Sequence, residues 1–504
     1  MDTRSLAIAR RRFLGGAATA GVAMLARAVG ASRAQNDTSA YLAVTYDAPG
    51  RQIAPDFVGL SYESAILATA DYFTPDNAPL LALIRSLGPD GVIRIGGNTS
   101  ERTLWGADAP STARNGFVIT PTGIDRLSAA LRMLGWKVIY GLNLAHGTAE
   151  AAAQEAAYVA TAMGTNLLAF QIGNEPDGFG RWTGARAGKY DAAAFLAEWQ
   201  RFHQAIRARV PQARFAGPDV ASETDWVAAL AGQRPAGLVL LTHHYYADGP
   251  AGAPHVTLRR LLHSGVRLAP VLEKLAYEGR RYALPYRLIE TNSVYNEGQP
   301  GVSDTLGAAL WGLELMFEAA AAGAAGVNFH GGGHNLRPGS EKAYTPIARS
   351  DGRYRAAPLY YGILAFAHGG RGTLLPARFA SGSKDCRAFA VRAPQGSLQV
   401  CLINKDFVRG TRVTIDAGHS FAASSIMRLA GPAIDATGGI TLGGSAVDEH
   451  GAWTPAMPER SHIPDAREIT VDVPSASARS SRCTHDPPAT ADSDSETRVG
   501  APTA

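Results

Sequence analysis

The sequence predicts an α/β fold, a (β/α)8 TIM barrel with an accessory antiparallel β-sandwich domain. The first observation is that eight short apolar runs follow one another through the middle of the chain. The second is that stretches with the apolar spacing of helices separate these runs. The third is a change beyond about residue 366, where short, partly alternating segments with Gly and Pro between them are typical of an antiparallel sandwich.

Each of the eight runs is expected to be one barrel strand. Most are apolar almost throughout, as strands are when both of their faces are buried. Strand and helix alternating eight times over roughly 300 residues is the pattern of a closed (β/α)8 barrel. The runs are FVGLSYE (57–63), GVIRIGG (91–97), KVIYGLNL (137–144), LLAFQIGNE (167–175), RFAGPDV (214–220), LVLLTHHYY (238–246), YRLIETN (286–292) and GVNFHGGG (326–333).

The same change of pattern divides the chain into domains. We expect the barrel at residues 52–365, and the sandwich at residues 38–51 together with 366–474. Residues 475–504 are rich in Ser, Ala, Thr, Asp and Pro and contain almost no large apolar residue. A segment of this composition cannot bury enough apolar surface to fold, so we expect a disordered tail there.

The first 34 residues have the pattern of an export signal. Arg10-Arg11-Arg12-Phe13-Leu14 precedes a short apolar stretch and a small-residue region that ends at Ala34, which resembles a twin-arginine signal. The apolar stretch is short and rich in Gly and Ala, which is not typical of a membrane span. We therefore expect a periplasmic or secreted protein that is not inserted in the membrane after processing.

Charge and cysteine content exclude several classes of partner. The net charge is +4, but the first 34 residues contain six arginines and one aspartate, so the rest of the chain is close to neutral. We therefore expect no binding of nucleic acid. Cys386, Cys401 and Cys483 are too few for a disulfide scaffold or a zinc site. Cys386 and Cys401 lie on neighbouring expected strands, where a disulfide stays possible, although we favour buried free thiols.

Two carboxylates lie where a barrel of this type places its functional groups, at the carboxyl ends of the strands. Glu175 ends the fourth run within Asn174-Glu175-Pro176, and Glu290 ends the seventh. Hydrolysis of a glycosidic bond needs such a pair, because one group protonates the leaving oxygen while the other attacks the anomeric carbon or activates water. Asn174 is placed to bond a sugar 2-hydroxyl. These residues predict a retaining glycoside hydrolase.

Four later motifs narrow this prediction. They are HHYY (243–246), IETNSVYNEG (289–298), SDT (303–305) and FHGGGH (329–334). With the Asn-Glu-Pro triplet they resemble glycoside hydrolase family 79, which contains β-glucuronidases and heparanases. The resemblance runs from GLSYE to the end of the eighth run, and it implies an exo-acting β-glucuronidase that removes terminal glucuronic acid from a glycan or glycoside by double displacement.

The resemblance also implies a role for each site residue. Glu175 would be the general acid/base and Glu290 the nucleophile, with Tyr246 holding the Glu290 carboxylate. The substrate ligands would be Tyr295, Tyr344 and the amides of Gly332 and Gly333 for the sugar carboxylate, and Glu63, Asn98, Asn143 and Asn174 for the hydroxyls. Of the adjacent His243 and His244, one should face the site because neighbouring strand residues point to opposite faces, and we assign His244 to it.

Neither a metal nor a cofactor is expected, because no further residue with metal-ligand spacing accompanies the histidine pair. Two alternatives of the same class stay open, a heparanase-like endo-β-glucuronidase and a related retaining enzyme acting on a neutral sugar. The barrel loops lack a dense basic cluster, which favours exo action over cleavage of a sulfated polymer. The alternative of another class is a carbohydrate-binding protein without turnover.

Overall fold

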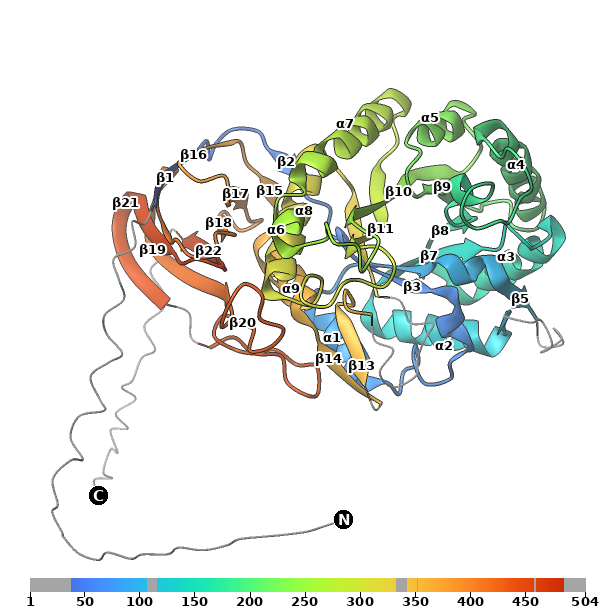
Figure 1. Cartoon of the computed structure of the whole chain (residues 1–504), viewed down its shortest axis with the longest axis horizontal. Coiled ribbons are helices and arrows are strands. Elements are labelled where there is room, and N and C mark those ends of the chain that lie inside the picture. Colours follow the sequence, from blue (N-terminus) through green and yellow to red (C-terminus); the bar gives the residue numbers. More distant parts are fainter. Residues whose placement is uncertain (1–37, 107–115, 332–341, 351, 457–458, 485–504) are drawn as a thin grey trace, which may run out of the picture.

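The computed structural model describes residues 38–106, 116–331, 342–350, 352–456 and 459–484 (Figure 1). Its larger part is a closed barrel of eight parallel strands, which confirms the predicted (β/α)8 fold. Every expected run supplies one strand. Around the barrel their order is β10 (Leu238–Asp248), β11 (Tyr286–Val294), β12 (Gly326–His330), β3 (Val58–Glu63), β4 (Val92–Gly96), β7 (Lys137–Leu142), β8 (Leu167–Ile172) and β9 (Phe215–Val220).

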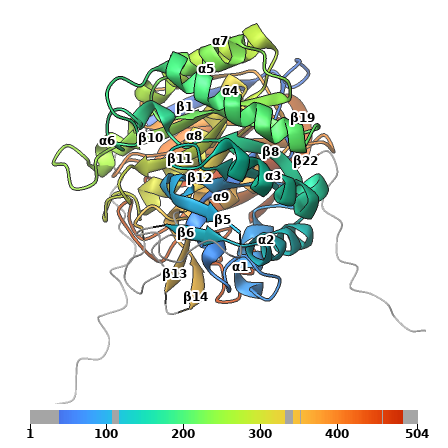
Figure 2. The same cartoon turned by 90° about the vertical axis from the view of Figure 1, so that its right-hand side faces the viewer.

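Helices cover the outside of this barrel (Figures 1 and 2). Threonines cap several of them, since Thr120, Thr148 and Thr305 each accept a hydrogen bond from a backbone N–H of the first helical turn. The helices are α1 (Ala78–Ser86), α2 (Pro121–Leu134), α3 (Ala149–Met163), α4 (Ala192–Arg209), α5 (Asp225–Gly232), α6 (Leu258–Leu262), α7 (Gly265–Tyr282), α8 (Leu306–Ala322) and α9 (Pro358–Gly369).

The interior of the barrel differs between its two ends. A separate buried cluster of apolar side chains fills the amino-terminal half, with one member from each of six strands: Val92, Ile139, Ala169, Ala216, Leu240 and Ile289. Closer to the carboxyl ends of the strands, buried side chains are polar or charged, such as Glu63, Asp219, His244 and Glu290. The carboxyl end, where these polar side chains lie, is therefore the end at which a functional site is expected.

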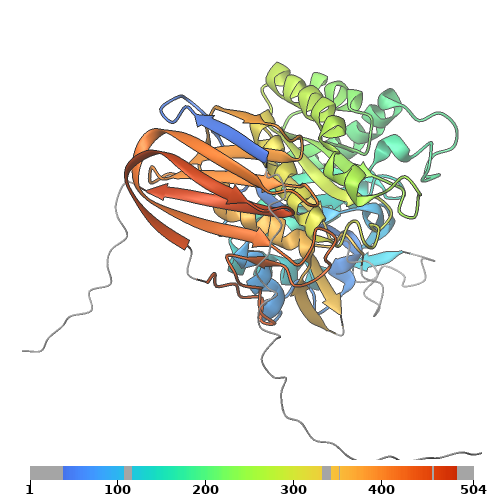
Figure 3. The ribbon, with the colours of Figure 1, turned by 60° about the vertical axis from the view of Figure 1, so that its left-hand side comes forward.

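A second, ten-stranded sheet adjoins the barrel and curls around its own apolar core, as the predicted accessory sandwich does (Figure 3). Helices α8 and α9 lie between the barrel and this sheet (Figure 1). Strand β1 pairs in parallel with β19, while the other pairings are antiparallel. The main strands are β1 (Thr38–Val44), β16 (Ala377–Ser381), β17 (Cys386–Arg392), β18 (Leu398–Asn404), β19 (Thr411–Ala430), β21 (Glu459–Val473) and β22 (Ser477–Thr484).

Strand β22 overturns part of the predicted domain boundary. The tail was expected from residue 475, but Ser477–Thr484 is a strand between β18 and β19. Its buried side chains are Arg479 and the small Ser477, Ala478, Ser481 and Cys483, so the segment joins the sheet without large apolar residues. The expectation of disorder is wrong for these eight residues, and residues 485–504 lie outside the described part of the chain.

Two further expectations concern cysteines and export. Cys386, Cys401 and Cys483 are all buried and free, which confirms the preferred interpretation over a disulfide. The export signal at residues 1–34 lies outside the described residues. Within the described residues, no helix combines the length and the apolar character that a membrane crossing requires.

Candidate active site

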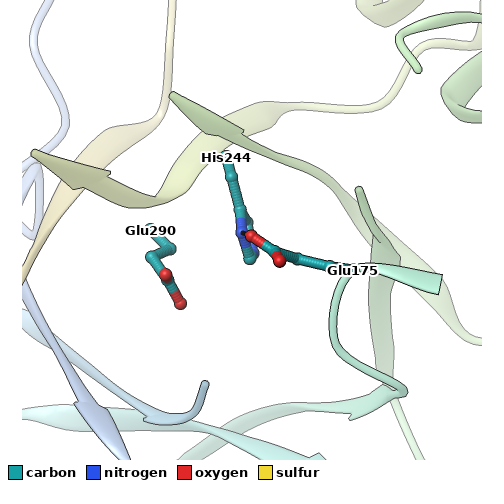
Figure 4. Close-up of side chains that lie close together, drawn as sticks. All are labelled: Glu175, His244 and Glu290. Carbon is teal, nitrogen blue, oxygen red and sulfur yellow. Dashed lines mark hydrogen bonds and ion pairs between the residues drawn. The ribbon is translucent and has the colours of Figure 1, made fainter. Parts of the chain in front are cut away.

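Glu175, His244 and Glu290 meet at the carboxyl ends of the strands (Figure 4). His244 and Glu290 lie directly opposite each other on the paired strands β10 and β11, while Glu175 follows β8. One carboxylate oxygen of Glu175, one of Glu290 and one ring nitrogen of His244 all lie within 4.8 Å of one another. Retaining glycosidases hold their two carboxyl groups about 5–5.5 Å apart and inverting ones about 6.5–9.5 Å, so this spacing fits the retaining geometry.

Glu290 is surrounded by donors and positive charge. Arg94 Nη1 donates to Oε2 over 2.6 Å, and the Tyr246 hydroxyl donates to Oε1 over 2.9 Å. His330 Nδ1 lies 3.7 Å from Oε2. Burial alone would raise the pKa of Glu290, but the charges of His330, His244 and Arg94 and the Tyr246 hydrogen bond hold it well below its ordinary value. Glu290 is therefore ionised, as a nucleophile must be.

Glu175 has the opposite character. Burial raises its pKa above the ordinary value, and the charges of Glu290 and Asp177 add to this, while the hydrogen bond and charge of His244 oppose it. Its backbone is left-handed, with φ of 47°, and its N–H donates to the Asp219 carbonyl over 2.9 Å. This conformation is uncommon for a residue with a side chain. A carboxyl with a raised pKa opposite one with a lowered pKa is the arrangement that a general acid and a nucleophile require.

A buried network of charged side chains connects the two glutamates. Arg94 Nη2 donates to Asp219 Oδ2 over 2.6 Å and to Asn174 Oδ1 over 2.7 Å. His244 places Nε2 at 2.8 Å from Asp219 Oδ1 and Nδ1 at 3.0 Å from Glu175 Oε1. His243 is directed away from this network, with its Nδ1 bonded to the His244 carbonyl. As expected from the strand alternation, only one histidine of the pair contacts the site.

Two of the expected sugar ligands are already bonded within the protein. Glu63 accepts from the N–H and the hydroxyl of Thr99, over 2.8 and 2.7 Å. Burial raises the pKa of Glu63, but the hydrogen bond and charge of His330 and the charge of Lys342 bring it to about 2. Asn143 donates to the Thr103 carbonyl, and its side-chain oxygen accepts two backbone N–H groups of the following loop. Contact of either side chain with a sugar stays a prediction.

Asn98 and Asn174 lie together beside the pair of glutamates. Asn174 donates from Nδ2 to Asn98 Oδ1 over 3.3 Å, and its own Oδ1 receives Arg94. Glu101 accepts the backbone N–H of Asn174 and fixes the turn that leads to Glu175. Asn98 is exposed and Asn174 is 3% exposed, so Asn98 is the more accessible of the two to a ligand.

The three tyrosines expected at the site lie close together, and one of them, Tyr246, bonds Glu290. The Tyr246 ring lies 6.5 Å from that of Tyr295 and 6.1 Å from that of Tyr344. Tyr295 is 42% exposed, whereas Tyr344 is buried. The Lys342 ammonium lies 5.8 Å from the centre of the Tyr344 ring. Tyr344 thus lies beside Tyr246, and its contact with a sugar stays a prediction, while Gly332 and Gly333 lie outside the described residues.

Sequence reasoning missed Arg94, Asp219 and His330 as parts of the site. Arg94 interrupts the apolar run GVIRIGG, and Asp219 stands near the end of RFAGPDV. A charged residue in an otherwise apolar strand is the signal that could have identified Arg94 and Asp219, because such a charge requires a partner inside the barrel.

The ligand atoms of Glu175, His244 and Glu290 are close enough together for a metal ion to be considered. Their chemistry is unfavourable to one. Both ring nitrogens of His244 face carboxylates, and both oxygens of Glu290 accept hydrogen bonds from Arg94 and Tyr246. A cation would also meet the positive charge of Arg94. The arrangement is that of an acid and a nucleophile.

No family model matches the chain. It is 26% identical over 356 residues to a protein named beta-glucuronidase from Aspergillus niger, covering 63% of each chain. It is 26% identical over 377 residues to one of the same name from Neurospora crassa, covering 65% of each. The matched part therefore spans less than two thirds of the length of these relatives.

Solved structures give a wider match to the fold. A 4-O-alpha-L-rhamnosyl-beta-D-glucuronidase from Fusarium oxysporum superposes with a TM-score of 0.74 at 19% identity, over 88% of this chain and 99% of that one. An alpha-L-arabinofuranosidase from Thermotoga maritima superposes with a TM-score of 0.65 at 14% identity, over 88% and 99%. The barrel with its attached β-domain is thus a fold that this chain shares with proteins named glucuronidase and arabinofuranosidase.

Proposed function

We propose that this protein is a retaining glycoside hydrolase of the family 79 type, which removes terminal β-linked glucuronic acid from a glycan or glycoside. The observation that carries the proposal is the pair Glu175 and Glu290, whose oxygens lie within 4.8 Å and whose environments favour opposite protonation states. The similarity to two proteins named beta-glucuronidase supports the choice of sugar.

In the first half of the reaction, Glu290 attacks the anomeric carbon and the bond from that carbon to the aglycone oxygen breaks. Glu175 gives its proton to the departing oxygen, so the aglycone leaves as a neutral alcohol. The product on the enzyme is an ester between the sugar and Glu290. Arg94 and Tyr246 hold the Glu290 carboxylate by one oxygen each, which fixes the direction of attack.

In the second half, Glu175 is a carboxylate and takes a proton from water. The water oxygen attacks the anomeric carbon, the ester bond breaks, and Glu290 leaves as a carboxylate. Two inversions at one carbon retain its configuration. The negative charge of Glu290 is one of the causes that raise the pKa of Glu175, and esterification removes this charge. The pKa of Glu175 therefore falls in the ester intermediate, which favours the ionised form that must accept a proton from water.

The uronate selectivity of the proposal depends on the region of Tyr295 and Tyr344. Tyrosine hydroxyls donate hydrogen bonds to a carboxylate, and the ammonium of Lys342 beside Tyr344 adds a positive charge. This combination favours a sugar that carries an anion over its neutral counterpart. The absence of a dense basic cluster in the sequence of the barrel loops supports exo action.

A panel of nitrophenyl glycosides tests the function directly. The purified protein should release nitrophenol from the β-glucuronide at least about 100-fold faster than from the β-glucoside, because only the former offers a charge to the pocket. Proton NMR of the first product formed should show the β-anomer. Hydrolysis of the glucoside alone would select the neutral-sugar alternative, cleavage inside heparan sulfate would select the endo alternative, and binding of glucuronides without any turnover would select a carbohydrate-binding protein.

Export by the twin-arginine route is a separate part of the proposal. It predicts that replacing Arg10, Arg11 and Arg12 by lysine retains the protein in the cytoplasm of the expressing cell. Cell fractionation followed by detection of the chain measures this. An equal periplasmic yield of the lysine variant would contradict it.

A further inference from the structure

Asp219 is linked to each of the two proposed catalytic carboxylates through one intervening side chain. It is fully buried near the end of β9. Its Oδ2 accepts from Arg94 over 2.6 Å, and Arg94 in turn bonds Glu290. Its Oδ1 lies 2.8 Å from His244 Nε2, and His244 in turn faces Glu175. The Asp219 carboxylate is therefore connected to Glu290 through Arg94 and to Glu175 through His244.

The backbone of Asp219 is part of the same arrangement. Its carbonyl accepts the Glu175 N–H over 2.9 Å, and its own N–H donates to Thr242 Oγ1 over 3.1 Å. Both Asp219 and Glu175 have left-handed backbones, with φ of 66° and 47°. Two adjacent strands thus fix the position of the acid through this residue.

The geometry of His244 determines its charge. Both ring nitrogens face carboxylate groups, Nδ1 at 3.0 Å and Nε2 at 2.8 Å, and the ring is buried. A neutral imidazole has one N–H, so one nitrogen would present a lone pair to a carboxyl group. The imidazolium donates at both positions, and the paired Asp219 carboxylate compensates its charge in a site from which water is excluded.

We propose that Asp219 is a positioning residue that holds His244 as the imidazolium, so that Nδ1 donates to Glu175 Oε1 and the acid carries its proton on Oε2. This inference rests on the proposed function. If Nδ1 instead presented a lone pair, it would bind the Glu175 proton and withdraw it from the aglycone oxygen. With Nδ1 as a donor, the transferable proton stays on the oxygen that His244 does not face. After the transfer, the same donor stabilises the Glu175 carboxylate that must accept a proton from water.

Several other ionisable groups face Asp219, His244 and Glu175. Their charges also act on the titration of His244 and Glu175, and they stay the same in the Asp219→Asn variant. They are Arg94 on β4, Asp177 after β8, His243 and Tyr246 on β10, Glu290 on β11 and His330 on β12.

The first test observes His244 itself and needs no substrate. The protein contains 13 histidines, and the signals of His244 are identified in long-range nitrogen–proton spectra of labelled protein by their loss in His244→Gln. In the wild-type chain both nitrogens should keep the imidazolium shift well above the ordinary histidine pKa of about 6.5. In Asp219→Asn, His244 should titrate near its ordinary pKa of about 6.5. A wild-type His244 that is neutral at pH 7 overturns the proposal, whatever the behaviour of the variant.

The second test follows turnover against pH and leaving group. Because His244 in Asp219→Asn is charged only below about pH 6.5, kcat/KM of this variant should be lost as pH rises through that value. The loss should reach roughly 10–100-fold for phenyl glucuronide and stay within about threefold for the dinitrophenyl substrate, which needs little protonation. Equal losses for both substrates, with an unshifted pH profile, would overturn the proposal.

Two further variants separate positioning from general damage. Glu155→Gln removes another buried carboxylate, bonded to Tyr140 over 2.6 Å outside the site, and should leave the pH profile unchanged. Asp219→Asn combined with His244→Gln should be no slower than His244→Gln alone. An additional tenfold loss would mean that Asp219 acts through Arg94 and Glu290, against the proposal. If the wild-type chain hydrolyses no glycoside, the proposed function fails while the His244 spectra still decide this inference.

Discussion

Among the described residues of the barrel, two arginines on its strands are buried, one at each end, and their surroundings differ. Arg94 at the carboxyl end bonds the carboxylates of Asp219 and Glu290. Arg287 at the amino end donates to the side-chain oxygen of Asn328 and to the carbonyls of Asp56, Phe57 and Ala325. Burial lowers the pKa of both groups, but the two carboxylates raise that of Arg94 above its usual value, whereas that of Arg287 falls to about 10.

The difference shows what each end of the barrel does. Arg287 joins β11 and β12 to the segment before β3 through neutral acceptors, which closes the packed end. Arg94 is held between the carboxylates of Asp219 and Glu290, and its charge is one of those that lower the pKa of Glu290. We therefore expect an arginine to contribute to stability at the amino end and to catalysis at the carboxyl end. Substitutions of Arg287 and Arg94 should separate an effect on unfolding from an effect on turnover.

The largest effect on the reactive end should come from Glu290→Ala. Loss of the nucleophile should reduce kcat by on the order of 10⁴-fold or more, while the melting temperature changes little. Steady-state kinetics on the nitrophenyl glucuronide and thermal unfolding measure the two quantities. Azide should restore turnover and give a product of inverted configuration. Turnover near the wild-type rate would remove Glu290 from its proposed role.

Arg94→Met and Arg287→Met compare the two ends directly. Arg94→Met should lower kcat/KM by roughly 10²–10³-fold and stability by about 3–5 kcal/mol, because it leaves buried carboxylates unpaired. Arg287→Met should lower stability by about 1–3 kcal/mol or more, through acceptors left without a donor. It should change kcat of the folded enzyme less than about threefold. Similar kinetic losses in both variants would show that the two arginines do not differ in their effect on turnover.

The pH dependence of kcat/KM should report the protonation states of Glu175 and Glu290. Glu290 must be ionised, so activity is lost as pH falls through its lowered pKa. Glu175 must be protonated, so activity is lost as pH rises through its raised pKa. The profile should therefore be a bell with its acid limb below, and its basic limb above, the range of ordinary carboxyl groups. In Glu290→Gln, carbon NMR should show Glu175 titrating at lower pH, because the neighbouring charge is gone.

The smallest expected effect lies at the edge of the site. Lys342→Met should raise KM for the glucuronide by about three- to tenfold, since a partly exposed charge contributes about 1 kcal/mol to binding. The KM for the glucoside should stay the same. A matched replacement of Lys274, which lies on α7 and pairs with Asp225, should affect neither substrate. An equal change for both sugars would argue against a uronate contact of Lys342.

The two arginines also show how far the sequence alone could predict the molecule. The apolar runs and their spacing predicted all eight barrel strands, and Glu175 and Glu290 were identified by their places at strand ends. Arg94 and Arg287 both interrupt an apolar run, and nothing local distinguishes them. The partners of Arg94 come from strands 125 and 196 residues further along the chain. They become neighbours only when the barrel closes, which no short sequence pattern encodes.

Strand β22 was missed for a different physical reason. Ser477–Thr484 pairs with both β18 and β19, although Ala478 and Cys483 are the only apolar residues in this strand. A sheet that already has an apolar core can accept small polar residues on a central strand, as at Ser481, which is fully buried. The composition of this segment is therefore similar to that of a disordered tail, although its backbone pairs with the strands on both sides.

The parallel pairing of β1 with β19 has a consequence for the order of assembly during synthesis. Thr38 and Thr411 are in contact although 373 residues separate them. At about 5–20 residues per second, a ribosome needs on the order of 20–70 s to make the chain between them. The barrel strands are complete before β19 exists, so the barrel can close while β1 still waits for its partners. The sandwich is then the last part to form, and it joins the start of the nascent chain to its most recently made segment.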